Sequence, residues 1–158
     1  MVKEGSKIDT NFSLDIVQGG EQQTKTFSEL LTRPTVVSVY MKNNTGSCDK
    51  QNESLAAHAG EFDRLGYNLM AISKDSCKSH MGYAQKLGIN YILASDPENL
   101  FPKATDSIVE KKMYGKTYEG PSRSAFIIGT DGTVKGVIEK IDPKNHAQEL
   151  MDKIKTLS

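Results

Sequence analysis

The chain has only two cysteines, no excess of either charge and no long hydrophobic run. Two cysteines cannot build the multi-bridge scaffold of a small secreted protein, so we expect a reduced, cytoplasmic resting state. Twenty basic and twenty acidic side chains cancel, which argues against nucleic acid or an anionic membrane as a partner. No stretch approaches the ~20 apolar residues that span a bilayer, and residues 1–5 lack the apolar core of a signal peptide.

Motifs that hold metals or nucleotides are missing too. His58, His80 and His146 are scattered, without partners at metal-ligand spacing. There is no C-x-x-C pair, which disfavours ordinary thioredoxin-type dithiol exchange, and neither a G-x-G-x-x-G motif nor a Walker A loop is present. We therefore expect no metal and no other cofactor.

What is present is a regular alternation of strand-like and helix-like segments. With 158 residues and no repeat or linker, residues 1–158 are predicted to form one domain. The pattern predicts an α/β domain whose central sheet is covered by helices on both faces. The predicted elements are an N-terminal β-hairpin over residues 12–26, strands over 35–40, 67–73, 91–93, 124–128 and 134–138, and helices over 27–31, 48–65, 76–87, 97–103 and 143–154.

Capping residues mark the predicted helix starts. Thr26 and Asp75 stand where N-caps belong, and Asp96 and Asp142 are each followed by a proline suited to the first helical position. The pair Lys111–Lys112 falls in no predicted element and is predicted to be solvated.

Cys48 is the most informative residue of the chain. It follows the β-branched strand 35–40 and the polar turn 42–47, and it opens a helical pattern. Unpaired backbone N–H groups at a helix start stabilise a thiolate, and the hydroxyl of Thr45 can face the sulfur or whatever it attacks. This pattern favours a nucleophilic cysteine, the alternative being a small buried hydrophobe.

Two further residues are candidates for the same site. Beside a thiolate, the Arg123 guanidinium would stabilise it and bind an incoming oxygen; alone, an arginine at a strand entrance is a solvated charge. Cys77 follows the strand 67–73 as Cys48 follows the strand 35–40. The helix between these strands makes them parallel, so both cysteines lie beyond one edge of the sheet. Cys77 is therefore either a thiol that traps oxidised Cys48 as a disulfide or a core residue of its helix.

Four short segments carry a resemblance to a known family. They are Thr45-Gly46-Ser47-Cys48, Ser73-Lys74-Asp75-Ser76 with Ser79-His80, Ser95-Asp96-Pro97, and residues 111–118 running into Arg123-Ser124-Ala125-Phe126. From about Gly5 to its end, the chain resembles the peroxiredoxins, and among them the branch of the bacterioferritin comigratory protein, or peroxiredoxin Q. The resemblance implies a thioredoxin-like fold with a central mixed sheet.

The resemblance also implies roles for individual residues. Cys48 matches the peroxidatic cysteine, Thr45 the hydroxyl that orients the peroxide and Arg123 the guanidinium that stabilises the thiolate. The implied reaction reduces hydrogen peroxide or an alkyl hydroperoxide through a Cys48 sulfenic acid, which thioredoxin or a similar thiol donor reduces again. The implied protein is a cytoplasmic monomer or weak homodimer.

Three positions depart from the family pattern. Met41 stands where the motif P-x-x-x-T-x-x-C has its proline, Gln51 where a glutamate is usual, and Glu53 where many members carry the resolving cysteine. A second group carries that cysteine at the position of Ala84, two turns beyond Cys77 on the same helix face. These changes leave an alternative function, a catalytically weak redox-sensing or binding module on the same fold.

Overall fold

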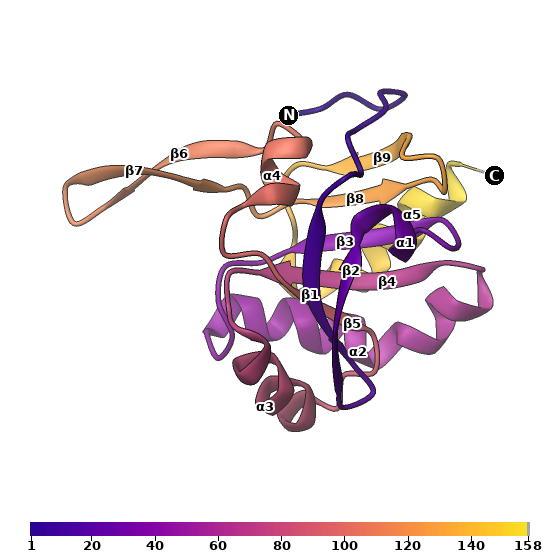
Figure 1. Ribbon diagram of the computed structural model, residues 1–158, viewed down its shortest axis with the longest axis horizontal. Coiled ribbons are helices and arrows are strands. Elements are labelled where there is room, and N and C mark those ends of the chain that lie inside the picture. The colour runs from indigo at the N-terminus through magenta and orange to yellow at the C-terminus, as the bar shows by residue number, and fades with distance from the viewer. Residues whose placement is uncertain (158) are drawn as a thin grey trace.

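A seven-stranded mixed sheet forms the centre of the computed structural model, which describes residues 1–157 (Figure 1). Its strands are β1 (Ser13–Gln18), β2 (Glu21–Thr26), β3 (Thr35–Val39), β4 (Asn68–Ser73), β5 (Ile92–Ser95), β8 (Ala125–Ile128) and β9 (Val134–Ile138). They lie in the order β2-β1-β5-β4-β3-β8-β9. The β3–β4 and β4–β5 pairs are parallel and the other pairs antiparallel, which confirms the predicted mixed sheet and N-terminal hairpin.

Helices cover both faces of this sheet, as predicted. They are α1 (Phe27–Leu30), α2 (Gly46–Arg64), α3 (Cys77–Leu87), α4 (Leu100–Ala104) and α5 (His146–Lys155), the last preceded by the 3₁₀ turn η1 (Pro143–Asn145). Helices α2, α3 and α5 pack on one face, whereas α1 and α4 pack on the other (Figure 1). None of the helices within residues 1–157 is long and apolar enough to cross a membrane.

The period-two alternation of β3 divides the core into two layers. Val36 points into the layer formed with α2 and α5, where it meets Leu55, while its neighbour Val37 points into the layer that contains Phe101 of α4. Cys48 belongs to the first layer. The sheet therefore fixes on which face, and at which end of β3, this thiol lies.

The cap predicted for α3 was wrong by one residue. Ser76 is the N-cap, and its side chain accepts a hydrogen bond from the backbone N–H of Ser79 at 3.2 Å. The Asp75 carboxylate instead accepts from the backbone N–H of Asn43 at 2.9 Å and from the hydroxyl of Ser73 at 2.7 Å. Asp75 thus ties the loop that follows β3 to the end of β4.

The two Asp-Pro pairs do not start their helices directly. Helix α4 begins at Leu100, and the Asp96 carboxylate caps it from a distance by accepting the backbone N–H groups of Leu100 at 2.8 Å and Phe101 at 3.0 Å. Pro143 opens the 3₁₀ turn η1, so that α5 proper begins only at His146.

We expect Asp96→Ala to lower the free energy of unfolding by about 1–2 kcal/mol, because two backbone N–H groups lose their acceptor. Asp96→Asn keeps one side-chain oxygen and should lose less. Urea denaturation followed by circular dichroism compares the three proteins. An unchanged midpoint for Asp96→Ala would contradict the capping role.

A long hairpin arm is the element that sequence reasoning missed. It consists of β6 (Ile108–Met113) and β7 (Lys116–Pro121), joined by the two-residue turn Tyr114–Gly115, both residues having positive φ. Figure 1 shows this β6–β7 arm projecting from the body of the molecule. Within it Lys112 is exposed, as predicted, but Lys111 is half-buried, so the prediction was wrong for that residue.

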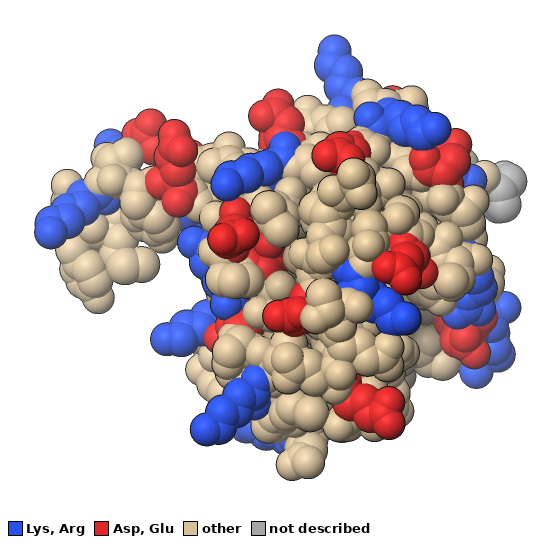
Figure 2. All heavy atoms as spheres, in the orientation of Figure 1, with Lys and Arg blue, Asp and Glu red and all other residues tan. Residues whose placement is uncertain are grey.

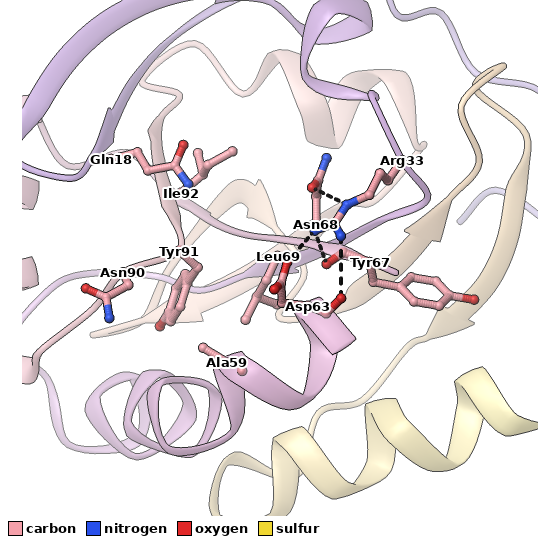
Figure 3. Close-up of a pocket in the computed structure, with 11 residues that line it drawn as sticks. Gln18, Arg33, Ala59, Asp63, Tyr67, Asn68, Leu69, Asn90, Tyr91 and Ile92 are labelled. Carbon is pink, nitrogen blue, oxygen red and sulfur yellow. Dashed lines mark hydrogen bonds and ion pairs between the residues drawn. The ribbon is translucent and has the colours of Figure 1, made fainter. Parts of the chain in front are cut away.

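A polar pocket of about 300 Å³ lies at the opposite, amino end of β4 and β5 (Figure 3). Arg33 dominates it through hydrogen bonds from its guanidinium to Asn68 Oδ1 at 3.0 Å, Asp63 Oδ1 at 2.9 Å and the carbonyl of Tyr67 at 3.0 Å. These bonds join the turn before β3 to the end of α2 and the start of β4. The Arg33 guanidinium therefore fixes the start of β3, at the end of the strand opposite Cys48.

Candidate active site

Cys48 lies in the first turn of α2, just beyond the carboxyl end of β3. Thr45 is the N-cap of this helix, and the side chain of Cys48 is only 1% exposed. Its Sγ accepts two hydrogen bonds, from the backbone N–H of Met41 at 3.4 Å and from Nη2 of Arg123 at 3.3 Å. A cation, a backbone donor and the first turn of a helix thus all meet at this sulfur.

Arg123 reaches the thiol because of how β8 pairs with β3. The backbone N–H of Val39 donates to the carbonyl of Ser124 at 2.9 Å, so the residue before Ser124 lies beside the loop that carries Cys48. The structure therefore brings together Cys48 and Arg123, 75 positions apart in the chain. Nothing in their spacing reveals this contact.

Thr45 lies at the rim of the site, half-buried. Its hydroxyl donates to the carbonyl of Lys42 at 2.8 Å. A hydroxyl whose proton is committed in this way presents its lone pairs as acceptors. The Thr45 hydroxyl is therefore free to accept a hydrogen bond from an O–H donor at this rim.

A buried polar network holds the loop between β3 and α2 in place. The Tyr40 hydroxyl donates to Asn43 Oδ1 at 2.6 Å, and Asn43 Nδ2 donates to Nδ1 of His80 at 3.1 Å. Nε2 of the same imidazole donates to the carbonyl of Ala94 at 3.0 Å. Burial lowers the pKa of His80, which keeps the ring neutral in this arrangement. The loop is therefore pre-organised rather than mobile around the thiol.

A second network clamps the first turn of α2. Asn52 Nδ2 donates to the carbonyl of Cys48 at 3.2 Å, and the Tyr91 hydroxyl donates to Asn52 Oδ1 at 3.0 Å. The Tyr83 hydroxyl donates to Asp49 Oδ1 at 2.8 Å. Sequence reasoning missed these supporting residues because they come from three separate elements. Exposing the Cys48 side chain to a large partner requires this turn to open.

Cys77 is not part of the Cys48 site in this structure. It is the first residue of α3, which packs over β5 and β1, and it is buried. Burial, and then the nearby charge of Asp15 on β1, raise the pKa of the Cys77 thiol. Strands β1 and β3 are separated by β5 and β4, a distance of about 14 Å at about 4.8 Å per strand. Both cysteines are free thiols, and a disulfide requires Cα atoms within about 7 Å.

Comparison with known proteins decides the family. Residues 7–137 match the AhpC/TSA family. The chain belongs to the AhpC/TSA family. It is 33% identical over 120 residues to Peroxiredoxin Bcp of Xanthomonas campestris, covering 76% of this chain and 75% of the relative. It is 28% identical to Peroxiredoxin Bcp of Escherichia coli over 138 residues, which cover 87% of each chain.

Solved structures agree with this assignment. X. campestris bacterioferritin comigratory protein superposes with a TM-score of 0.86 at 26% identity, covering 98% of each chain. X. campestris peroxiredoxin Q gives a TM-score of 0.84 at 28% identity, covering 93% of this chain and 91% of that one. The predicted thioredoxin-like fold is thereby confirmed. Peroxiredoxins are thiol peroxidases, and this protein is one of them.

Met41, which replaces the family proline, adds a contact to this peroxiredoxin. Its backbone N–H donates to Cys48 Sγ, a hydrogen bond that proline cannot make because it has no N–H. Its side chain is half-buried and packs against both core layers. The replacement therefore keeps the thiol covered and supplies one more donor to the thiolate.

Gln51, which replaces the family glutamate, belongs to a hydrogen-bond network that connects α2 through Ser38 of β3 to α5. Its Nε2 donates to Ser38 Oγ at 2.8 Å and to the carbonyl of Val39 at 3.2 Å. Ser38 Oγ lies 2.8 Å from Nε2 of His146, whose Nδ1 lies 2.8 Å from Glu149 Oε1. A carboxylate could not donate to the Val39 carbonyl, so the amide suits this position. Its Oε1 is buried without a hydrogen-bond partner.

Basic side chains gather near Cys48, among them Arg123, Lys111 and Lys74. Figure 2 shows lysine and arginine atoms in the angle between the β6–β7 arm and the body of the molecule. Lys111 of the arm places its Nζ 2.8 Å from Sδ of Met41. Burial lowers the pKa of Lys111, and the charges of Arg123 and Lys74 lower it further. The described residues 1–157 contain no cluster of His, Cys, Asp and Glu suited to a metal ion.

Proposed function

We propose that this peroxiredoxin reduces hydrogen peroxide and alkyl hydroperoxides with Cys48 as its peroxidatic cysteine. The observation that carries the proposal is the pair of hydrogen bonds on Cys48 Sγ, from the Arg123 guanidinium and the Met41 N–H. The Cys48 thiolate attacks the terminal oxygen of the peroxide. An S–O bond forms, the O–O bond breaks, and its electron pair leaves on the second oxygen, which becomes water or an alcohol after protonation.

The neighbouring side chains position the peroxide for this attack. Arg123 donates to the thiolate and, having further N–H groups, also to a peroxide oxygen beside it. Thr45 accepts from the peroxide O–H because its own proton is held by the Lys42 carbonyl. The backbone N–H groups at the start of α2 stabilise the charge that develops during O–O cleavage. No step requires a group outside this set except a proton for the leaving oxygen.

The sulfenic acid formed on Cys48 is reduced by an external thiol donor of the thioredoxin kind. One donor thiol releases water and forms a mixed disulfide, and a second donor thiol then releases Cys48. Cys77 is a poor internal resolver because burial and the charge of Asp15 raise its pKa, and it lies at the start of α3, which packs over β5 and β1. Such donors are kept reduced in the cytoplasm, where we place the protein.

Alkyl hydroperoxides are included because of a close structural relative. The X. campestris bacterioferritin comigratory protein, which shares this fold over 98% of its chain, is described by its alkyl peroxide reduction activity. In the present chain, half-buried Met41, whose N–H binds Cys48 Sγ, offers an apolar surface for an alkyl group beside the thiol. This surface supports the proposed substrate class.

Removing the Thr45 hydroxyl is expected to slow Cys48 oxidation by about tenfold, in line with one lost hydrogen bond to the reacting molecule. Thr45→Val keeps the shape of the side chain and lacks the acceptor, whereas Thr45→Ser retains it and should stay near the wild-type rate. Single-turnover kinetics with hydrogen peroxide distinguish the two. Equal rates for both variants would argue against a role of this hydroxyl in holding the peroxide.

Trapping the sulfenic acid tests the proposed function itself. Pre-reduced protein is treated with one equivalent of hydrogen peroxide in the presence of dimedone, and the labelled peptide is identified by mass spectrometry. We expect label on the peptide containing Cys48 and none on the Cys77 peptide. Protein that neither consumes peroxide nor takes up label would contradict the proposed function and favour the binding module.

A further inference from the structure

Lys111 of β6 is half-buried between two exposed neighbours. Its neighbours Glu110, Lys112 and Met113 are all exposed, whereas Lys111 turns toward the body of the molecule and reaches Met41. The arm projects from the body of the molecule (Figure 1), and the contact of Lys111 Nζ with Met41 Sδ brings one ammonium group of the arm close to the site. This placement needs an explanation, because a lysine gains nothing from burial without a partner.

The contacts of Lys111 do not satisfy it. Its Nζ has three N–H donors, and the contact at 2.8 Å is to a thioether sulfur, which is a weak acceptor. None of the ion pairs among residues 1–157 includes Lys111, and the charges that act on it are those of Arg123, Lys74 and Cys48. An ammonium surrounded by two cations and a weak acceptor is ready to bind an oxygen that carries negative charge.

Met41 connects this ammonium to the reacting thiol. Its backbone N–H lies 3.4 Å from Cys48 Sγ and its Sδ lies 2.8 Å from Lys111 Nζ. One residue thus spans the space between the attacking sulfur and the ammonium. Because the sulfur attacks along the O–O axis, a peroxide held by Arg123 and Thr45 would point its second oxygen away from Sγ.

We propose that Lys111 is the acid that protonates the leaving oxygen when Cys48 attacks a peroxide. The proposal rests on the peroxidatic role proposed for Cys48. As the S–O bond forms and the O–O bond breaks, the electron pair on the departing oxygen takes a proton from Lys111 Nζ. The products are the Cys48 sulfenic acid, water or an alcohol, and a neutral Lys111 that regains its proton from solvent. Arg123 cannot serve in this way because a guanidinium does not lose its proton in proteins.

The test compares two peroxides that differ in their need for a proton. Hydrogen peroxide expels hydroxide, a strong base, whereas peracetic acid expels acetate, a weak base that leaves without protonation. Lys111→Met should slow single-turnover oxidation of Cys48 by hydrogen peroxide about 100-fold at neutral pH and change the peracetic acid rate less than about threefold. Lys112→Met removes the same charge from the exposed neighbouring position and should leave both rates at the wild-type level.

The pH profile provides a second, independent readout. Because burial and the cations Arg123 and Lys74 lower the pKa of Lys111, the wild-type rate with hydrogen peroxide should fall on the alkaline side below the usual lysine pKa of about 10.4. Lys111→Arg keeps the positive charge but not a transferable proton. This variant should be slow with hydrogen peroxide and should lack the alkaline fall.

The possible outcomes distinguish a general acid from a residue that acts on the thiolate or the fold and from a bystander. Equal slowing of both peroxides by Lys111→Met would show that Lys111 acts on the thiolate or the fold, and unchanged rates would show a bystander; either result overturns the proposal. Circular dichroism of each variant checks that the arm change leaves the fold intact. Wild-type protein inert toward both peroxides would overturn the peroxidatic role of Cys48 as well.

Discussion

Cys48→Ser is expected to lose peroxidase activity by several orders of magnitude, whereas Cys77→Ser is expected to retain nearly all of it. The serine hydroxyl is far less acidic than the thiol and is not ionised at neutral pH, so no nucleophile remains beside Arg123. Cys77 contributes no atom to the site, and its raised pKa makes it a poor nucleophile. The measurement is peroxide consumption with excess dithiothreitol as donor.

The two serine variants control for each other. Both replace a buried sulfur at the start of a helix, α2 or α3, so a loss that comes only from weakened packing would affect both. Comparable urea midpoints with very different activities would assign the loss to chemistry. Residual activity in Cys48→Ser close to the wild-type level would contradict the account of the site.

Arg123→Met is expected to slow oxidation of Cys48 by hydrogen peroxide about 100- to 1,000-fold at neutral pH. The guanidinium donates to Cys48 Sγ at 3.3 Å, and in the proposed reaction it also holds the peroxide, so its loss removes a hydrogen bond from the sulfur and from the transition state. Methionine retains the length and packing of the side chain. Stopped-flow single-turnover kinetics measure the rate, and ultraviolet absorbance at neutral pH measures the thiolate fraction.

Arg123→Lys is the matched control for that experiment. It keeps the charge but replaces the planar fork by a single ammonium, which cannot bind sulfur and peroxide in the same geometry. We expect a rate between those of the wild type and Arg123→Met, with a smaller loss of thiolate. A rate for Arg123→Met within about threefold of wild type would mean that the Met41 N–H and the helix start alone are sufficient.

Two of the three departures from the family pattern, Met41 and Gln51, are compatible with catalysis. Met41 supplies a backbone N–H to the thiolate that the family proline lacks. Gln51 uses its amide to bind Ser38 and the Val39 carbonyl, which steadies the end of β3 directly beneath the site. Both substitutions therefore support the geometry around Cys48, and they weaken the alternative of a module that has lost its activity.

Those parts of the fold that depend on local pattern could be predicted from the sequence. The β-branched run of β3 and the polar turn directly precede Cys48, so the order strand–turn–helix was predicted correctly. The predicted helix start at Cys48 was two residues late, because α2 begins at Gly46 with Thr45 as its N-cap. The parallel pairing of β3 with β4 followed from the helix between them.

Other parts depend on contacts that sequence spacing does not reveal. The β6–β7 arm carries charged residues without apolar alternation, so its strands gave no period-two signal. Asp75 has the chemistry of an N-cap, but tertiary contacts with Asn43 and Ser73 occupy its carboxylate. The approach of Arg123 and Lys111 to Cys48 required the three-dimensional structure, although the resemblance to peroxiredoxins had already suggested the role of Arg123.

The most direct test of the central claim is the intact mass of pre-reduced protein after one equivalent of hydrogen peroxide, recorded under denaturing, thiol-blocking conditions. Cys48 lies beside Arg123, whereas Cys77 is a buried residue at the start of α3 with a raised pKa, so we predict the gain of one oxygen atom, located on Cys48. Loss of two hydrogens would instead show a disulfide with Cys77 and contradict the need for an external thiol. An unchanged mass would contradict the proposed role of Cys48 altogether.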